Sequence, residues 1–299
     1  MQLPNTPIQE IHNSLFEKKG IRVLVKRDDL NHSVISGNKF RKLKYNLEQA
    51  KAEGHTTLLT FGGAFSNHIY AVAGVGKTFG FKTIGVIRGE AHEKLNPTLA
   101  FAKSQGMHLH YMDRETYRRK DEREVLKQLE KQFGNYYMLP EGGTNELAVK
   151  GCEEVITEVD QDFDIITCPV GTGGTLSGLI SGLNGQKKVL GFSSLKGNFL
   201  QNEVEQLLLT YSASTYANWV VNSEYHFGGY AKVKPDLISF ILEFEDTYDI
   251  PLEPIYTGKM FYGLFDLIDK DFFEKGTTIM ALHTGGLQGN AGFDFRKMK

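Results

Sequence analysis

The sequence predicts an α/β fold with parallel sheets. Short apolar runs alternate along the chain with stretches of helical spacing, and glycine-rich turns follow several of the apolar runs directly. The chain has 299 residues and 40% hydrophobic content, which is enough to bury a large core and is typical of about two domains.

Nine apolar runs have the length and bounding turns of strands, and helical patterns fill most of the gaps between them. These expected strands are 21–26, 57–61, 82–87, 107–111, 136–139, 164–170, 188–192, 219–222 and 277–282. We expect a small domain at 46–145 and a large domain made of 1–45 plus 146–299. In the charged stretch 113–131, opposite charges recur at spacings of three and four, which predicts one exposed helix without chemistry.

Composition narrows the class of function. The formal net charge is −2, with acidic and basic residues interspersed, so neither a nucleic-acid footprint nor a membrane-binding stripe is expected. The N-terminal residues lack the pattern of a signal peptide, and no apolar run has the roughly 20 residues that span a bilayer. We expect a cytoplasmic protein that acts on small molecules, with Cys152 and Cys168 as reduced packing residues.

The segment 37–43, GNKFRKL, places a lysine at an expected helix start. The partial positive charge of the helix end, with Arg41 and Lys42 close by, should lower the pKa of Lys39. A neutral lysine amine can form a Schiff base. The alternative is that these cations form the solvated face of a surface helix, which is the commoner meaning of a charge run taken alone.

A glycine-rich turn follows the expected strand 164–170 and precedes a helical pattern at 176–183. Such a strand, turn and helix can form a phosphate site from backbone N–H groups and the helix dipole. Leu176 and the pair Ser193-Ser194 fit a dinucleotide fingerprint poorly. A tight turn that binds nothing is the competing interpretation, although two threonine hydroxyls favour phosphate. The turn consists of Gly171, Thr172, Gly173, Gly174 and Thr175.

A third glycine turn, at 61–68, ends in Ser66, Asn67 and His68 at another expected helix start. Ser66 and Asn67 have the residue types of a helix cap. As functional groups, they would bind a substrate carboxylate at the helix end, and Ser66 would offer its hydroxyl to the reacting carbon. Tyr230 and Tyr256 follow later as candidate acid or base groups, or as packed aromatic residues.

Two other patterns carry competing functions. The segment 71–78, AVAGVGKT, resembles a permissive nucleotide-binding loop and would make the chain a nucleotide-binding protein. Its context argues against that function, because 66–79 is expected to form one continuous helix. His108 and His110 lie on one face of an expected strand, but further metal ligands are not evident, so we assign no metal site.

Five motifs together resemble the pyridoxal-phosphate enzymes that comprise 1-aminocyclopropane-1-carboxylate deaminase and D-cysteine desulfhydrase. The motifs are GNKxRKL at 37–43, GGxxSN at 62–67, GTGGT at 171–175, YxGK at 256–259 and HxGG at 283–286, and they span almost the whole chain. The resemblance implies fold type II, similar to the tryptophan synthase β subunit, with two three-layer α/β/α domains and pyridoxal 5'-phosphate in the cleft. It also implies a homodimer.

The resemblance further implies roles for individual residues. Lys39 would form the Schiff base and act as base for the α-proton. Lys42 and the 171–175 turn would hold the phosphate, and Asn67 would face the ring hydroxyl. Other matched residues would line the substrate side, with Tyr230 placed only by its local context. They are Ser66, Asn67, His68, Tyr230 and Tyr256.

Thr257 and Thr284 bear on the reaction. Deaminases of this family carry Glu and Leu at these two positions, whereas desulfhydrases carry hydroxyl residues at both. A threonine would donate a hydrogen bond to an uncharged pyridine nitrogen, which is the weaker electron sink and suits a substrate with a leaving group. We therefore expect a lyase or hydrolase that converts D-cysteine to pyruvate, ammonia and hydrogen sulfide. Cyclopropane deamination to 2-oxobutanoate and ammonia is the alternative, and a non-catalytic pyridoxal-phosphate binder is another.

Overall fold

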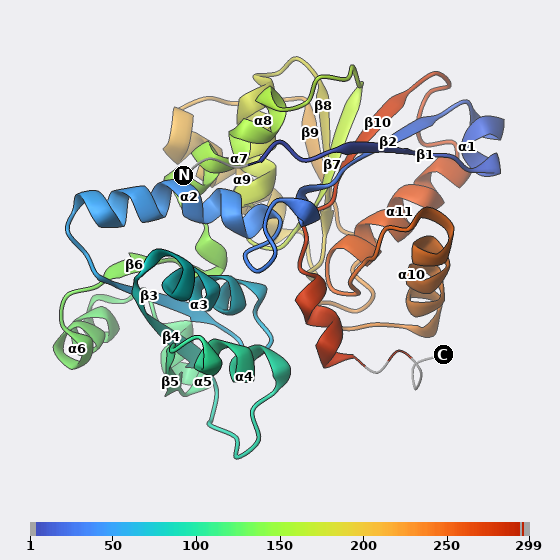
Figure 1. The fold of residues 1–299 in the computed structure, drawn as a ribbon. Coiled ribbons are helices and arrows are strands. Elements are labelled where there is room, and N and C mark those ends of the chain that lie inside the picture. The colour runs from blue at the N-terminus through green and yellow to red at the C-terminus, as the bar shows by residue number, and fades with distance from the viewer. Residues whose placement is uncertain (1–3, 294, 296–299) are drawn as a thin grey trace.

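The computed structural model describes residues 4–293 and 295 of the chain. They contain two sheets, one of six strands in the order β1-β2-β10-β7-β8-β9 and one of four strands in the order β5-β4-β3-β6 (Figure 1). All neighbouring strands are parallel except β1 and β2. The predicted α/β fold with parallel sheets is confirmed.

The six-stranded sheet takes its strands from both ends of the chain. They are β1 (Ile8–Ile11), β2 (Arg22–Lys26), β7 (Ile165–Val170), β8 (Lys188–Ser193), β9 (Trp219–Asn222) and β10 (Thr278–Leu282). The prediction missed β1, because its four residues include Gln9 and Glu10 and so lack an apolar run. This short strand pairs antiparallel with β2 and forms one edge of the sheet.

The four-stranded sheet uses consecutive strands from the first half of the chain. They are β3 (Thr57–Gly62), β4 (Lys82–Arg88), β5 (His108–Met112) and β6 (Tyr137–Leu139). Each lies within one residue of its expected bounds. The buried runs of β3 and β4 are nearly continuous, as expected for parallel strands covered on both faces.

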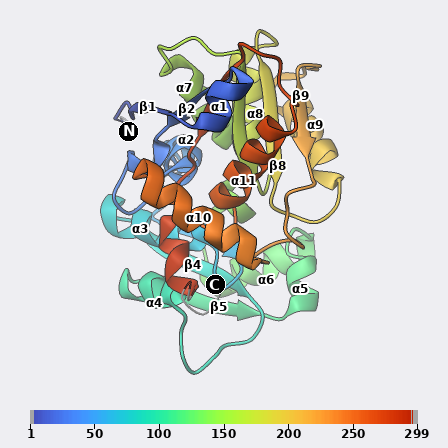
Figure 2. The same cartoon turned by 90° about the vertical axis from the view of Figure 1, so that its right-hand side faces the viewer.

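Helices cover both faces of each sheet, which gives two three-layer α/β/α units. On the larger sheet, α1 (Ser14–Lys19), α10 (Pro235–Tyr248) and α11 (Thr257–Asp269) pack on one face (Figure 2), and α7 (Glu146–Thr157), α8 (Gly174–Leu183) and α9 (Phe199–Ser212) pack on the other. On the smaller sheet, α2 (Asn38–Ala52), α3 (Asn67–Phe79) and α4 (Pro97–Ser104) share one apolar core, and α5 (Arg114–Arg118) and α6 (Arg123–Phe133) share another. Short 3-10 turns lie at Asp28–Leu30, Glu141–Gly143 and Leu287–Gly292.

Helix α2 joins the two units. Its apolar side, which includes Leu43 and Leu47, packs into the core of the smaller unit, and the same helix also packs against α7 of the larger unit. The expected boundary at 45/46 falls inside this helix. We propose that 46–145 is the small domain and that α2 connects it to the rest.

The stretch 113–131 is not one helix, as was predicted, but two. Helix α5 ends at Arg118, and α6 begins at Arg123 after a turn. The break allows Tyr117 to pack edge-on against Phe61, with ring centroids 6.1 Å apart, while Val125 and Leu129 enter the same apolar cluster. Buried contacts of this kind outweigh the i,i+4 charge pairs from which a single helix was expected.

Two other expectations concern chain-wide properties. Cys152 and Cys168 are both free and buried, as predicted for packing residues. None of the described helices is long and apolar enough to cross a membrane.

Candidate active site

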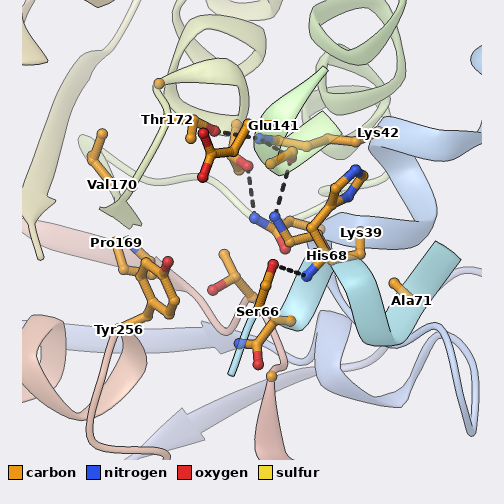
Figure 3. Close-up of a pocket in the computed structure, with 18 of the residues that line it drawn as sticks. Lys39, Lys42, Ser66, His68, Ala71, Glu141, Pro169, Val170, Thr172 and Tyr256 are labelled. Atoms are coloured by element: carbon orange, nitrogen blue, oxygen red, sulfur yellow. Dashed lines mark hydrogen bonds between the residues drawn. The ribbon is translucent and has the colours of Figure 1, made fainter. Parts of the chain in front are cut away.

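A cavity of about 570 Å³ lies where the carboxyl ends of strands from the two sheets meet (Figure 3). The turns after β3, β6, β7 and β10 all contribute to its wall, which is the usual ligand position in parallel α/β folds. Most predicted site residues are brought together there. Those lining the cavity are Lys39, Lys42, Ser66, Asn67, His68, Gly171, Thr172, Gly173, Thr175, Tyr230, Tyr256 and Thr284.

Lys39 is placed by the close approach of α2 to the end of β10. Gly37 precedes the helix with φ of 70°, and a Cβ on it would lie 1.9 Å from the carbonyl oxygen of Thr284. Only glycine fits this position. The amide of Asn38 donates to the same Thr284 oxygen at 3.2 Å. The start of α2 is therefore fixed against the turn that carries Thr284.

The amines of Lys39 and Lys42 point to the same region of the cavity (Figure 3). The Nζ of Lys39 donates to the carbonyl oxygen of Gly142 at 3.2 Å, and that of Lys42 donates to it at 3.3 Å. Burial, followed by the charge of Lys42, lowers the pKa of Lys39 well below its usual range. Lys42 is buried and Lys39 half-buried, which contradicts the alternative of a solvated surface helix.

Arg41 does not contribute to this site, contrary to the prediction that it would lower the pKa of Lys39. Its guanidinium is fully buried and makes bidentate contacts with two carboxylates, those of Asp28 and Glu158. These partners hold it on another side of α2. Arg41 and Lys42 are adjacent on α2, and adjacent side chains on a helix point in different directions. Lys42 therefore reaches the cavity and Arg41 does not.

The turn after β7 has the features of an anion cradle. Gly173 has φ of 81° and α8 begins at Gly174, so free backbone N–H groups lie at the end of a buried helix. A Cβ on Gly174 would lie 3.1 Å from the Nζ of Lys42, and that Nζ is also 3.3 Å from the hydroxyl of Thr172. An ammonium, hydroxyls and free amides together fit a phosphate.

Ser66 has the capping role predicted for it and also lies at the cavity, where its functional role stays a prediction. Its Oγ accepts from the amides of His68 and Ile69 at 3.2 and 3.3 Å, and so caps α3, while the residue also lines the cavity. Asn67 opens the helix, and its side chain lies against Gly286, where a Cβ would come within 2.7 Å. The turns after β3 and β10 are therefore in contact.

His68 is a neutral histidine with one nitrogen engaged. Its Nε2 lies 2.8 Å from the hydroxyl of Thr60, and that hydroxyl donates to the carbonyl oxygen of Leu139, so the ring nitrogen is the donor to Thr60. The Nδ1 is buried and has no hydrogen-bond partner among the described residues. Burial, with the charges of Lys39 and Lys42, lowers the pKa of His68 well below its usual range.

Tyr256 faces the lysines across the cavity (Figure 3), and Tyr230 lies beside it. Their ring centroids are 6.2 Å apart at an interplanar angle of 65°. Burial, followed by Tyr230 and Glu253, raises the pKa of Tyr256 well above its usual range, and burial raises that of Tyr230. Both phenols are therefore protonated at neutral pH and can donate a hydrogen bond.

The two threonines are placed differently. Thr284 lines the cavity, whereas Thr257 is fully buried outside its lining. The hydroxyl of Thr257 lies 3.2 Å from a carboxylate oxygen of Glu253, and it accepts from the Glu253 amide at 3.1 Å. Thr257 and Gly174 are the two predicted site residues that do not line the cavity.

Several residues of the site escaped the sequence analysis. The turn Glu141–Gly143 supplies the carbonyl oxygen shared by Lys39 and Lys42, and Thr144 accepts from Lys42 at 2.9 Å. Arg88 and Lys120 line the cavity from the smaller unit, so the 113–131 stretch does reach the site. The pair Gly142-Gly143 after a short strand could have predicted this turn. Arg88 and Lys120 have no sequence pattern that marks them as site residues.

The nucleotide-loop alternative is wrong. Residues 71–78 lie inside α3, a continuous helix from Asn67 to Phe79, and Gly74 and Gly76 are buried against neighbouring side chains. Such glycines allow close packing and leave no loop to surround a phosphate.

Comparisons with known proteins agree on a family. A D-cysteine desulfhydrase from Klebsiella pneumoniae is 26% identical over 94% of this chain and 91% of its own length. A Pyrococcus horikoshii protein, provisionally named a 1-aminocyclopropane-1-carboxylate deaminase, is 32% identical over 95% of this chain and 90% of its own length. These names do not support the hydrolase class that was named beside lyase.

The fold comparison and the family model cover nearly the same residues. The crystal structure of a 1-aminocyclopropane-1-carboxylate deaminase homologue matches 98% of this chain and 94% of its own, with 29% identity and a TM-score of 0.85. The family model of pyridoxal-phosphate dependent enzymes matches residues 1–285. The chain therefore belongs to the pyridoxal-phosphate dependent enzymes and has their type II fold.

Proposed function

We propose that the protein catalyses a deaminating α,β-elimination that converts D-cysteine to pyruvate, ammonia and hydrogen sulfide. The observation that carries the proposal is the position of Thr284, a hydroxyl residue that lines the cavity together with Gly285 and Gly286. The carboxylate nearest in sequence to the YxGK motif, that of Glu253, is bound to three backbone amides and lies outside the cavity lining.

The residues present fit the cofactor. Lys39 would attach it covalently, while Lys42 and the turn 171–175 would hold its phosphate and Asn67 its ring hydroxyl. Thr284 would donate a hydrogen bond to the pyridine nitrogen. When bound, pyridoxal phosphate supplies a conjugated ring that delocalises the electron pair left on the α-carbon.

The substrate side follows from the remaining residues. The turn 62–66 and the start of α3 would bind the α-carboxylate, since Ser66 and Asn67 line the cavity and the partial positive charge of this helix end favours an anion. The Nζ of Lys39, freed when the substrate amine takes its place, would take the α-proton, and its lowered pKa favours the neutral form that can accept it. The hydroxyl of Tyr256 would donate a hydrogen bond to the departing sulfur, because the raised pKa of that phenol keeps it protonated.

The leaving group decides between the two candidate reactions. A thiolate departs readily, so elimination needs only a moderate electron sink. Opening a cyclopropane needs a stronger sink, which a carboxylate at the ring nitrogen would maintain by keeping the nitrogen protonated. The names of the deaminase relatives favour that second reaction, and cyclopropane deamination to 2-oxobutanoate is therefore the alternative. A homodimer in the cytoplasm stays a prediction.

The test is a comparison of rates. Pure protein loaded with pyridoxal phosphate is incubated with D-cysteine, L-cysteine or 1-aminocyclopropane-1-carboxylate, and keto acid, ammonia and sulfide are measured. We expect the highest kcat/KM with D-cysteine and equal yields of pyruvate and sulfide. A higher kcat/KM with the cyclopropane substrate would assign the deaminase reaction instead, and a cofactor-loaded protein without turnover would support the non-catalytic binder.

A further inference from the structure

Two charged residues are buried beside the cavity without lining it. Lys259 is 1% exposed and Glu253 is fully buried, and they lie on either side of the residue that begins α11, Thr257. Burying a charge is costly unless its hydrogen bonds are satisfied. The partners of these two groups therefore show what the buried charges do.

Lys259 holds a strained turn. Its Nζ donates to the carbonyl oxygens of His226 and Gly229, both at 2.9 Å. Phe227 lies between His226 and Gly229 in the chain, and Ala231 follows them. Both have φ of 54°, in the left-handed region that non-glycine residues rarely adopt. A turn with such a backbone persists only where its surroundings fix it.

This turn carries Tyr230 into the active site. The tyrosine is 37% exposed, so side-chain packing alone restrains it incompletely, and its position depends on the backbone on each side. It follows Gly229, whose carbonyl oxygen is one of the two that Lys259 holds. The ring then meets Tyr256 edge-on at the cavity wall.

Glu253 fixes the other tyrosine. Its carboxylate accepts from the backbone amides of Ile255 and Tyr256, both at 2.8 Å, and of Thr257 at 2.6 Å. These bonds set the chain direction where α11 begins. The backbone of Tyr256 is therefore held by a buried carboxylate. Its ring packs against Gly171, where a Cβ would come within 2.9 Å of the ring.

We infer that Lys259 is a positioning residue that sets Tyr230 against Tyr256 through the carbonyl oxygens of His226 and Gly229. Lys259 itself touches neither the cavity nor, in this account, the substrate. The kinetic part of the inference rests on the proposed function, because it assigns Tyr230 to the substrate side of that site. The structural part stands on the hydrogen bonds alone.

Hydrogen exchange tests the structural part. The amides of Gly229 and Lys232 are bonded within the turn, and their exchange is measured in the holoenzyme. Lys259→Met removes both donor bonds and keeps an apolar stem of similar length. We expect faster exchange in the 226–232 segment and unchanged exchange in α10. Unchanged exchange in the segment would overturn the inference, and Lys259→Leu, which also lacks a donor, repeats the test if the methionine variant does not fold.

Lys26→Met is the matched control. Lys26 is another fully buried lysine whose Nζ donates to a backbone carbonyl, that of Thr6, at 2.7 Å, and it does not line the cavity. Its replacement removes a buried ammonium of the same kind. We expect normal exchange in 226–232 for this variant, and loss of protection there would show a general effect of buried lysines rather than a local clamp.

A double-mutant cycle with Tyr230→Phe tests the kinetic part. If Lys259 acts through Tyr230, Lys259→Met should lower kcat/KM for D-cysteine at least about tenfold in the wild type and less than about twofold in Tyr230→Phe, since residues acting on one group are not additive. Additive losses would contradict the inference. Lys26→Met should combine additively with Tyr230→Phe. If the wild type turns over no substrate, the proposed function fails, and the exchange result alone decides the role of Lys259.

Discussion

Lys39 and Lys42 donate to one carbonyl oxygen, that of Gly142, at 3.2 and 3.3 Å. Two ammonium groups in one low-dielectric site disfavour each other's charge. Lys42 has further partners in Thr144 and Thr172, whereas the Nζ of Lys39 donates to no hydroxyl among the described residues. Burial lowers the pKa of both amines, but that of Lys39 is lowered well below its usual range, while Lys42 is held among hydroxyls.

Lys42 should be required for cofactor affinity. Lys42→Met is expected to weaken binding of pyridoxal phosphate at least about tenfold, the effect of losing one charge-assisted hydrogen bond to the phosphate. Equilibrium dialysis measures the affinity. Lys44→Met is the control on the same helix, because the Lys44 amine pairs with Glu154 at 2.5 Å and lies outside the cavity lining. Equal losses in both variants would contradict the assignment of Lys42.

The two threonines should separate in their effects. Thr284→Val is expected to lower kcat for D-cysteine with little change in Tm, because Thr284 lines the cavity and no described residue is hydrogen-bonded to its hydroxyl. Thr257→Val is expected to lower Tm by about 2 °C, since it removes a buried hydrogen bond worth about 1 kcal/mol. Steady-state kinetics and a thermal scan of both variants check this. The reverse pattern would show that Thr257 is the residue that contacts the cofactor.

The buried ion pairs beneath α2 should dominate the stability of that helix. Arg41→Met leaves Asp28 fully buried without its bidentate partner, which should cost about 3–5 kcal/mol of unfolding free energy. Arg22→Met removes the exposed pair with Glu10 and should cost at most about 1 kcal/mol. Denaturant unfolding of the two variants measures the difference, and similar costs would refute the role given to burial.

Lys259 should make stability depend on pH. Burial lowers its pKa to about 8 in the folded protein, whereas an unfolded lysine has a pKa of about 10.4. Between these values the unfolded chain binds more protons, so the free energy of unfolding should rise with pH from about 8 to about 10. Lys259→Met should show a smaller rise than the wild type when both are unfolded in denaturant across this range. Equal slopes would mean that folding does not lower the pKa of Lys259.

Periodicity and turn chemistry were sufficient to predict most of the fold. Each of the nine expected strands lies within one residue of an observed one, because buried parallel strands are apolar runs bounded by glycine or polar turns. The failures have physical reasons. Strand β1 is too short and polar to stand out, and the break between α5 and α6 depends on the burial of Tyr117, a tertiary contact without a local signal.

The candidate site divides in the same way. Lys39, Ser66 and the 171–175 turn follow strands or open helices, so local patterns placed them. The direction of Arg41 and the partner of Thr257 depend on Asp28 and Glu253, which come from other segments of the chain. The local sequence therefore did not show that Arg41 would form a buried ion pair with Asp28. It also did not show that the Thr257 hydroxyl would contact Glu253 instead of lining the cavity.

Borohydride reduction of the holoenzyme, followed by peptide mapping, tests the central claim most directly. The account predicts a pyridoxyl group on Lys39 and none on Lys42, because Lys39 is the amine with the strongly lowered pKa. In Lys39→Ala, reduction should leave no cofactor on the protein. A pyridoxyl group on Lys42 in the wild type, or on any lysine of Lys39→Ala, would contradict it.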